Sequence, residues 1–168
     1  MRRVPKCFTD IISLLLTGRS TVLKFDNFIS NPIPLLNSTT QGDPSSMNYY
    51  AFYNAPLIKT TIGDNELSLG FVGDSMVLAI GDLLAQCHEG LKDMMERPGG
   101  CFSWSLSHNS PFKLTKTALM NFPRSFRDLI LGPLSLDKPN PDSSVTMSIT
   151  HPVSSYKYLG VIFDPRLH

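Results

Sequence analysis

The stretch of sequence that decides the fold is residues 67–80, which reads LSLGFVGDSMVLAI. Its first five residues alternate apolar side chains with small or polar ones, as in a β-strand with one apolar face. Residues 73–75, which include Gly73 and Asp74, have the composition of a tight turn. Residues 76–80 are mainly apolar without alternation, which indicates a strand covered on both faces. The stretch therefore predicts a β-hairpin with Asp74 at its tip.

Helices are predicted on both sides of this hairpin. Asp43 followed by Pro44 predicts a helix start, because the carboxylate can accept hydrogen bonds from free N–H groups and proline has no N–H to satisfy. We expect this helix to end or kink near Pro56. After the hairpin, Asp82 is expected to cap a further helix, which Pro98 ends.

The N-terminal segment predicts a helix followed by a second hairpin. Pro5 can open the helix and Gly18 closes it. Apolar residues recur at the spacing of one face of an amphipathic helix, namely Phe8, Ile11, Ile12 and Leu15. Residues 20–29 are expected to fold back across Asp26 and Asn27, a pair typical of hairpin turns.

The C-terminal third predicts two strands separated by an irregular segment. Residues 112–122 and 156–163 have the composition of strands, whereas residues 132–155 are rich in Pro, Ser and Asp and are expected to form a long loop or insertion. Trp104 and His108 are placed in a loop and given no role. The order of elements predicts an α+β fold, with helices packed on one face of an antiparallel sheet.

The composition excludes several classes of protein. The chain has 168 residues, of which 42% are hydrophobic and 17% charged, so it is not a charge-driven disordered chain, a coiled coil or a collagen-like repeat. Its net charge of +1 excludes a basic field over the whole surface. The charge is uneven, because residues 1–24 and 113–127 are basic and residues 60–97 are acidic. Local basic patches therefore remain open as sites for nucleic acid.

Cysteine usage and hydropathy indicate the compartment. The three cysteines are widely spaced and form no CxxC pair, which indicates free thiols in a reducing environment. Cys87 and His88 are adjacent but have no third ligand at zinc-site spacing, so we interpret them as ordinary helix residues. No apolar run is long enough to cross a bilayer. We expect a soluble, intracellular protein with no membrane partner, and the sequence leaves the oligomeric state open.

Four segments, in this order and spacing, resemble the reverse transcriptase domain of non-LTR retrotransposons. Residues 41–46, QGDPSS, are similar to that family's QGxPxS loop, which leads into a helix. Residues 71–74, FVGD, resemble its hairpin with an aromatic residue and two aspartates. Residues 113–117, KLTKT, resemble its lysine-bearing strand, and residues 158–164, YLGVIFD, its YLGxxxD strand. The resemblance covers nearly the whole chain.

The resemblance implies a partial right-hand polymerase palm. Residues 1–40 would be a helix and hairpin near the fingers, 41–131 the palm core, 132–155 a loop or insertion, and 156–168 the strand at the end of the palm. The family's reaction is RNA-templated DNA synthesis, with an RNA template, a DNA primer, nucleoside triphosphates and Mg²⁺. Such a reaction uses two Mg²⁺ ions about 4 Å apart, held by several carboxylates.

The resemblance also assigns roles to single residues. Asp74 would be the catalytic and metal-binding carboxylate. Gln41 and Gly42 would line the nucleotide pocket, where a glycine lets the backbone come close to the ligand. Lys116 would face the triphosphate and stabilise the leaving group. The primer end would be supported by Tyr158, Leu159 and Gly160.

Two departures from the family predict an inactive site. Gly73 stands where the family's hairpin has its first aspartate, and the family's upstream metal-binding aspartate would lie before residue 1. One carboxylate is then expected to remain, at Asp74, and we expect no Mg²⁺ to be bound. The alternatives are a non-enzymatic remnant that binds RNA or RNA–DNA duplexes, or a product that does not fold stably. Taken alone, Gly73 and Asp74 are ordinary turn residues.

Overall fold

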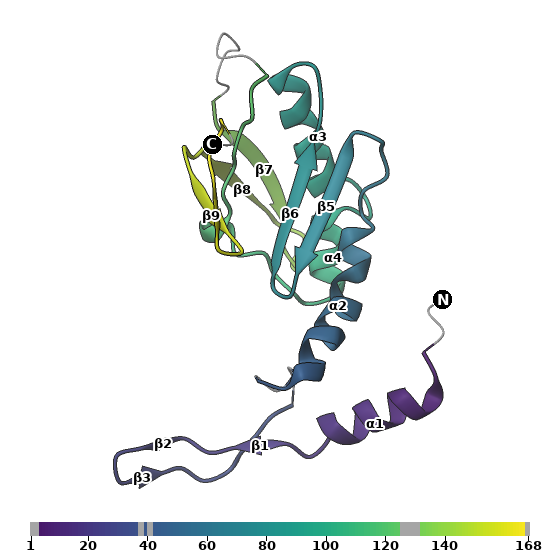
Figure 1. Ribbon diagram of the computed structural model, residues 1–168, viewed down its shortest axis with the longest axis vertical. Helices are drawn as coiled ribbons and strands as arrows, with labels where there is room; N and C mark the ends of the chain where they lie inside the picture. The colour runs from purple at the N-terminus through teal and green to yellow at the C-terminus, as the bar shows by residue number, and fades with distance from the viewer. Residues whose placement is uncertain (1–3, 37–38, 40–41, 125–131, 167–168) are drawn as a thin grey trace. The chain divides into compact units, whose positions relative to one another are not determined.

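The fold is described from a computed structural model of the chain, in which residues 4–36, 39, 42–124 and 132–166 are described. The chain divides into two compact units, Met1–Tyr50 and Ala51–His168. The described residues of both units form α-helices and short antiparallel strand pairs (Figure 1). The protein is therefore of mixed α+β class, as the sequence predicts at this level.

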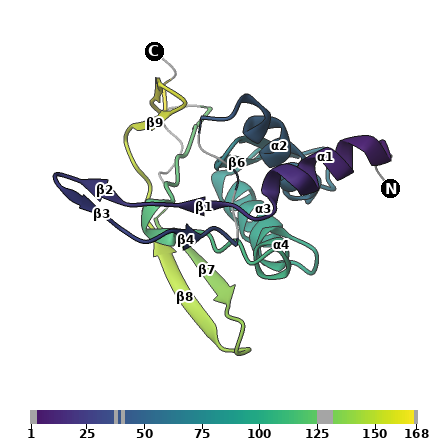
Figure 2. The same ribbon diagram turned by 90° about the horizontal axis from the view of Figure 1, so that it is seen from below.

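The first unit begins with a helix and a narrow two-stranded ribbon. Helix α1 (Lys6–Leu16) is followed by strands β1 (Ser20–Thr21), β2 (Lys24–Phe25), β3 (Phe28–Ile29) and β4 (Ile33–Pro34). Strand β1 pairs with β4, and β2 with β3, so the four strands form the two legs of one hairpin (Figure 2). Asp26, in the turn, has a φ of 48°. The predicted helix and the predicted turn at Asp26 are both confirmed.

Helix α2 (Pro44–Ile58) begins where the sequence predicts it. The Asp43 carboxylate accepts hydrogen bonds from the Ser45 N–H at 2.8 Å and the Ser45 hydroxyl at 2.6 Å. These bonds lower the pKa of Asp43, because they stabilise its charged form. The helix continues through Pro56 and ends two residues later, at Ile58.

The central hairpin of the second unit is formed by β5 (Glu66–Phe71) and β6 (Asp74–Ala79). Its turn differs from the prediction, because Phe71 pairs with Asp74 and the two turn residues are Val72 and Gly73. Asp74 is thus the first residue of β6 and not the tip. The expectation that residues 76–80 are covered on both faces is also wrong, since none of them is fully buried. A two-stranded hairpin with helices on one face leaves its other face open.

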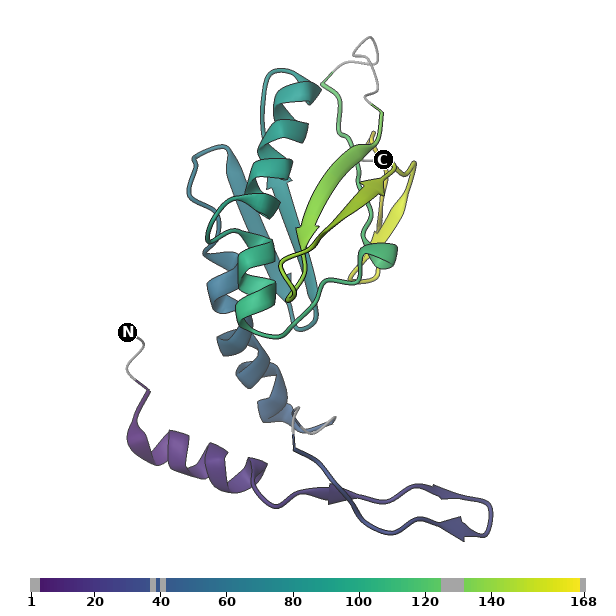
Figure 3. The same cartoon turned by 180° about the vertical axis from the view of Figure 1, so that it is seen from behind.

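Two helices cover one face of this hairpin. Helix α3 (Leu84–Glu96) packs against β6, and the shorter α4 (Cys101–Ser107) follows it on the same side (Figure 3). Asp82 does not cap α3 as expected: the N-cap residue is Leu83, whose N–H donates to the Gln86 side chain at 3.3 Å. Trp104 lies in α4 and not in a loop, so that expectation is wrong too.

The segment expected to be a loop, residues 132–155, contains a second hairpin. Strands β7 (Leu134–Pro139) and β8 (Val145–Thr150) pair along six residues each. Leu134 and Leu136 are buried, and α3 packs against β7. Alternation of apolar and polar residues in both strands gave a strand pattern that the prolines obscured. Tertiary contact with α3 gives β7 the buried surface that stabilises it.

The two strands predicted near the C-terminus take other forms. Residues 112–122 contain the 3₁₀ helix η1 (Leu114–Lys116) and one isolated bridge, from Leu119 to Pro152. Residues 156–163 form a hairpin of β9 (Tyr156–Tyr158) and β10 (Val161–Phe163) and not a single strand. Its two-residue turn, Leu159 and Gly160, has φ values of 49° and 88°, as in the turns that favour tight hairpins.

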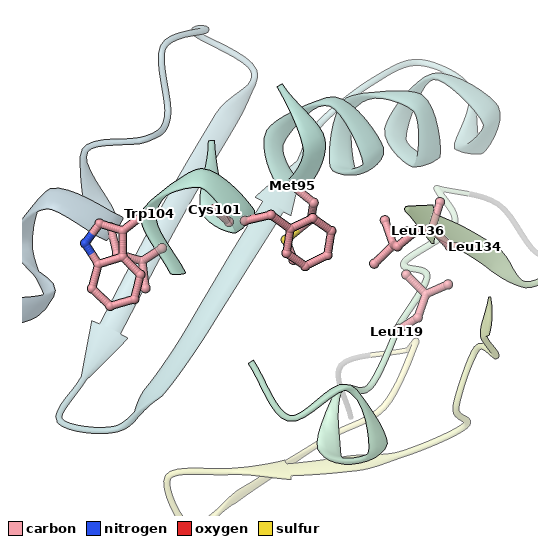
Figure 4. Packing of buried hydrophobic residues seen from close by; sticks show 8 residues of the cluster. Met95, Cys101, Trp104, Leu119, Leu134 and Leu136 are labelled. Carbon is pink, nitrogen blue, oxygen red and sulfur yellow. The ribbon is translucent and has the colours of Figure 1, made fainter. Parts of the chain in front are cut away.

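The core of the second unit lies between these helices and hairpins (Figure 4). Helix α4 contributes Cys101, Phe102 and Trp104, of which Phe102 is 1% exposed. The buried side chains that form one cluster are Leu57, Met95, Cys101, Phe102, Trp104, Leu119, Leu134 and Leu136. Residues from α2 to β7 therefore share one apolar interior, which holds the hairpin β5–β6 in place through Val77.

Candidate functional site

The site that the sequence predicts centres on Asp74, which is exposed at the start of β6. The preceding turn is fixed from the helical side, because the buried Asn54 side chain of α2 donates a hydrogen bond to the Val72 carbonyl. Strand β5 also lies close to α2: a Cβ added at Gly70 would be 3.2 Å from Cδ1 of Ile58. Val72 itself has a φ of 51°, a strained value for a β-branched residue. The backbone at Asp74 is therefore well supported, while its carboxylate faces solvent.

Tyr158 is the predicted residue whose pKa is affected by Asp74. Burial raises the pKa of the Tyr158 phenol, and the negative charge of Asp74 raises it further. A charge acts in this way only over a short range. The electrostatic effect of Asp74 therefore reaches a residue of a second motif that carries the resemblance and lies far away in the sequence.

Leu159 and Gly160 form the turn that follows Tyr158. A Cβ added at Gly160 would meet nothing within 4 Å, so its φ of 88° and not close packing favours glycine there. Leu159 is exposed. The YLG motif thus supplies the last residue of β9 and the two turn residues that follow it.

Lys116 is the last residue of η1 and is exposed. Its backbone N–H donates to the Lys113 carbonyl at 2.8 Å, in the 3₁₀ pattern. The strand expected for residues 113–117 is therefore a helical turn. Within the described part of the chain, no hydrogen bond or ion pair joins Lys116 to Asp74.

The predicted nucleotide loop belongs to the first unit, whereas Asp74, Lys116 and Tyr158 belong to the second. Gln41 lies outside the described residues. Gly42 has a φ of 87°, and a Cβ added there would have no atom within 4 Å. As at the later turn, the backbone conformation accounts for the glycine.

The donors at the site do not match those of a two-metal centre. Mg²⁺ takes hard oxygen ligands, and two such ions need several carboxylates. Where the structure describes the chain, no group of three or more His, Cys, Asp or Glu side chains is placed to hold a metal ion. Asp74 therefore provides one anionic side chain, which does not fit the family's metal pair, and the Tyr158 phenol, with its raised pKa, adds no second charge.

One aromatic cluster was not predicted from the sequence. His108 stacks on Trp104, with ring centroids 4.7 Å apart, and Tyr53 meets both rings edge to face. The Tyr53 hydroxyl donates to the His108 carbonyl at 2.7 Å. The spacing of Trp104 and His108, four residues apart as on one helix face, could have indicated it.

A second unpredicted feature is a buried polar pair. His88 on α3 is 9% exposed, and its Nε2 lies 2.8 Å from Oδ1 of Asn121. The neighbouring Cys87 is half-buried, with its Sγ 3.9 Å from the Gly81 carbonyl. The pair links α3 to the segment after η1, and nothing in the sequence near either residue marks it.

The chain was compared with protein-family profiles, with curated proteins and with solved structures, and no match was found. Among the described residues, no helix has the length and apolar character needed to cross a membrane.

Proposed function

We propose that the chain is a segment of a reverse transcriptase palm that has lost polymerase activity. The observation that carries the proposal is that the charge of Asp74 helps to raise the pKa of Tyr158, although the two residues come from two separate motifs of the resemblance. In a polymerase palm, the carboxylate hairpin and the strand that supports the primer end must lie at one site. A hairpin with helices packed on one face is also the setting that the resemblance implies for Asp74.

The loss of activity follows from the residues of the hairpin. Gly73 provides no carboxylate, and Asp74 alone gives Mg²⁺ one anionic side chain. Removing one preorganised catalytic group typically lowers a rate by about 10²–10³-fold. Loss of a carboxylate shared by two metal ions is expected to lower the rate further, because both ions then lose a negatively charged ligand.

Primer extension tests the loss of activity. The purified chain is incubated with an RNA template, an annealed DNA primer, deoxynucleoside triphosphates and Mg²⁺, beside an Asp74→Asn control of equal size. We expect no extension in either sample. Incorporation by the wild-type chain that Asp74→Asn abolishes would contradict the proposal.

Descent from a metal-binding hairpin is tested by restoring the second carboxylate. Gly73→Asp should bind Mn²⁺ more tightly than the wild-type chain, because two adjacent carboxylates then face one ion. Gly73→Asn is the matched control without the charge. Paramagnetic broadening of the amide signals of residues 71–75 reports the binding. Equal broadening in the Gly73→Asp and Gly73→Asn variants would show that the hairpin does not bind a metal ion through a carboxylate at position 73.

Nucleic-acid binding without catalysis is the second candidate. Lys113, Lys116 and Arg124 are exposed, and residues 113–127 contain no acidic residue. Within the described residues, none of these three side chains forms an ion pair. Their charge is therefore available to phosphates. Affinity for an RNA–DNA duplex should fall steeply with added salt and more weakly in a Lys113→Ala/Lys116→Ala variant. Binding that is absent or independent of salt would exclude this function.

A further inference from the structure

The two turn residues of the hairpin β5–β6 stand in the reverse of the order that their turn type favours. Val72 has a φ of 51°, whereas Gly73 is not among the described glycines with a positive φ. In a two-residue hairpin turn, these signs of φ are those of type II′, in which glycine is favoured at the first position. Here a β-branched residue stands first and glycine second, so the local sequence does not explain the observed turn.

Rotation of one peptide group would give the turn that a glycine at the second position favours. In a type I′ turn both residues have a positive φ, and the common sequences place glycine second. Types II′ and I′ differ mainly in the orientation of the peptide group between the two turn residues. That group carries the Val72 carbonyl on one side and the Gly73 N–H on the other. Both types match the twist of a hairpin, so the twist of the strands does not select between them.

A hydrogen bond from α2 meets this peptide group. The Asn54 side chain is 6% exposed, and its amide donates to the Val72 carbonyl. The bond forms only while the carbonyl points toward Asn54, because rotation of the peptide group would turn the Gly73 N–H to that side. The buried amide would then face a second donor and lose its acceptor, which is unfavourable. The contact therefore stabilises type II′ and not type I′.

The position of the Asn54 amide is fixed by its helix. Leu57, on the same side of α2, is 3% exposed and belongs to the core. Ile58 lies against β5, since a Cβ added at Gly70 would be 3.2 Å from its Cδ1. Residues at spacings i, i+3 and i+4 share one helix face, so this face of α2 lies along the hairpin. All of these residues belong to the second unit.

We propose that the turn at Val72 and Gly73 has two conformations and that the Asn54 hydrogen bond holds it in type II′. Without this bond the peptide group rotates, Gly73 takes a positive φ, and the turn becomes type I′. Asp74 directly follows the turn, so Asn54 also fixes the backbone that leads into its strand. The proposal rests on the geometry of the turn and does not depend on descent from a polymerase.

NMR spectroscopy of the full chain tests the role of Asn54. The amide protons of Val72 and Gly73 are far apart in a type II′ turn and close together in type I′, so the NOE between them reports the rotation. We expect this NOE to be weak in the wild-type chain and strong in Asn54→Leu, which removes the donor with little change in side-chain volume. Asn48→Leu, at an exposed position of the same helix, is the matched control and should leave the NOE weak. A strong NOE in the wild-type chain, or a weak one in Asn54→Leu, would overturn the proposal.

Gly73→Ala gives a second test, by denaturant unfolding followed through the fluorescence of Trp104 in the core. Alanine in place of glycine stabilises a position with a compatible φ and destabilises one with a positive φ. Gly73→Ala should therefore raise the folding equilibrium constant of the wild-type chain about 2–5-fold and lower that of Asn54→Leu. A decrease in the wild-type chain would overturn the proposal, whether or not Asn54→Leu folds. Equal effects in the two backgrounds would also overturn it.

Discussion

Arg97, directly after α3, forms a two-point ion pair with Glu66, the first residue of β5. Its guanidinium donates to the two carboxylate oxygens of Glu66 at 2.7 and 2.6 Å, and to the Thr60 carbonyl at 2.6 Å. Both side chains are mostly buried, at 11% and 14% exposure. The pair therefore joins the end of the helix layer to the start of the central hairpin, and its paired hydrogen bonds fix their relative direction.

This pair predicts acid sensitivity. Hydrogen bonding to Arg97 is the main cause that lowers the pKa of Glu66 from 4.5 to about 2. The Glu66 carboxylate is therefore harder to protonate in the folded state than in the unfolded state. The resulting stabilisation is present above the unfolded pKa of 4.5 and is lost as the pH falls toward 2. Denaturant unfolding followed by Trp104 fluorescence should show this loss, and Glu66→Gln should remove that part of the pH dependence.

Substitution of Glu66 at neutral pH measures how much its ion pair with Arg97 contributes to the free energy of unfolding. Glu66→Gln should lower the free energy of unfolding by roughly 2–3 kcal/mol at pH 7, because it leaves the Arg97 charge partly uncompensated in a buried position. Asp93→Asn is the control: Asp93 contacts the same guanidinium at 3.0 Å but is 61% exposed, so its loss should cost less than about 1 kcal/mol. Equal effects would show that the pair with Glu66 is not the stabilising one.

Cys101 should resist alkylation in the folded protein. It is 1% exposed, and burial raises the pKa of its thiol, so the reactive thiolate is scarce. Cys7 is exposed. With iodoacetamide at pH 8, mass spectrometry should find Cys101 modified at least ~10³-fold more slowly than Cys7, because it reacts only after the core opens. Similar rates would mean that α4 is not packed in the core.

In the hairpin β7–β8, alanine substitution at two positions should change the free energy of unfolding by very different amounts. Leu136 is 3% exposed and belongs to the core, whereas Met147 on β8 is 66% exposed. Leu136→Ala should lower the free energy of unfolding by about 2–4 kcal/mol, through lost burial and a cavity. Met147→Ala should change it by less than about 0.5 kcal/mol. Thermal melts of both variants check the register, since a slip of β8 by one residue would turn Met147 to the face of Leu136 and make its truncation costly as well.

The effect of Asp74 on the pKa of Tyr158 can be measured directly. Removing the charge with Asp74→Asn should lower the pKa of Tyr158 toward its ordinary value, while the larger effect of burial remains. Titration of the ¹³Cζ signals of the tyrosines by NMR gives each pKa. An unchanged pKa of Tyr158 would separate the two motifs and remove the main support for the proposed palm.

Local rules predicted the elements whose signals are local. The cap at Asp43, the turn at Asp26 and the hairpin around residues 67–80 all depend on neighbouring residues, and the structure contains each of them. The segment 132–155 was missed because its prolines lie at the ends and turn of a hairpin, where proline is tolerated. Its strand state is stabilised by α3, which lies far away in the sequence.

The candidate site, too, was predicted only where the signal in the sequence is local. Motif order suggested Asp74 and Tyr158, and the charge of Asp74 helps to raise the pKa of Tyr158 in the fold. It does not give Lys116 the expected strand, because the segment 113–117 forms a 3₁₀ turn. The polar contacts of Arg97 with Glu66 and of His88 with Asn121 join residues more than thirty positions apart, so no local pattern could reveal them.

The sequence by itself determined that this is an α+β chain with capped helices and tight turns, and it set one carboxylate, Asp74, beside Gly73. Spacing and turn chemistry act over a few residues, so they can be interpreted without a structure. Only the tertiary structure decided that Asp74 begins a strand, that residues 132–155 fold into a hairpin, and that the first unit buries no described residue. These outcomes depend on which apolar faces pack against each other, and such packing joins elements that lie far apart in the sequence.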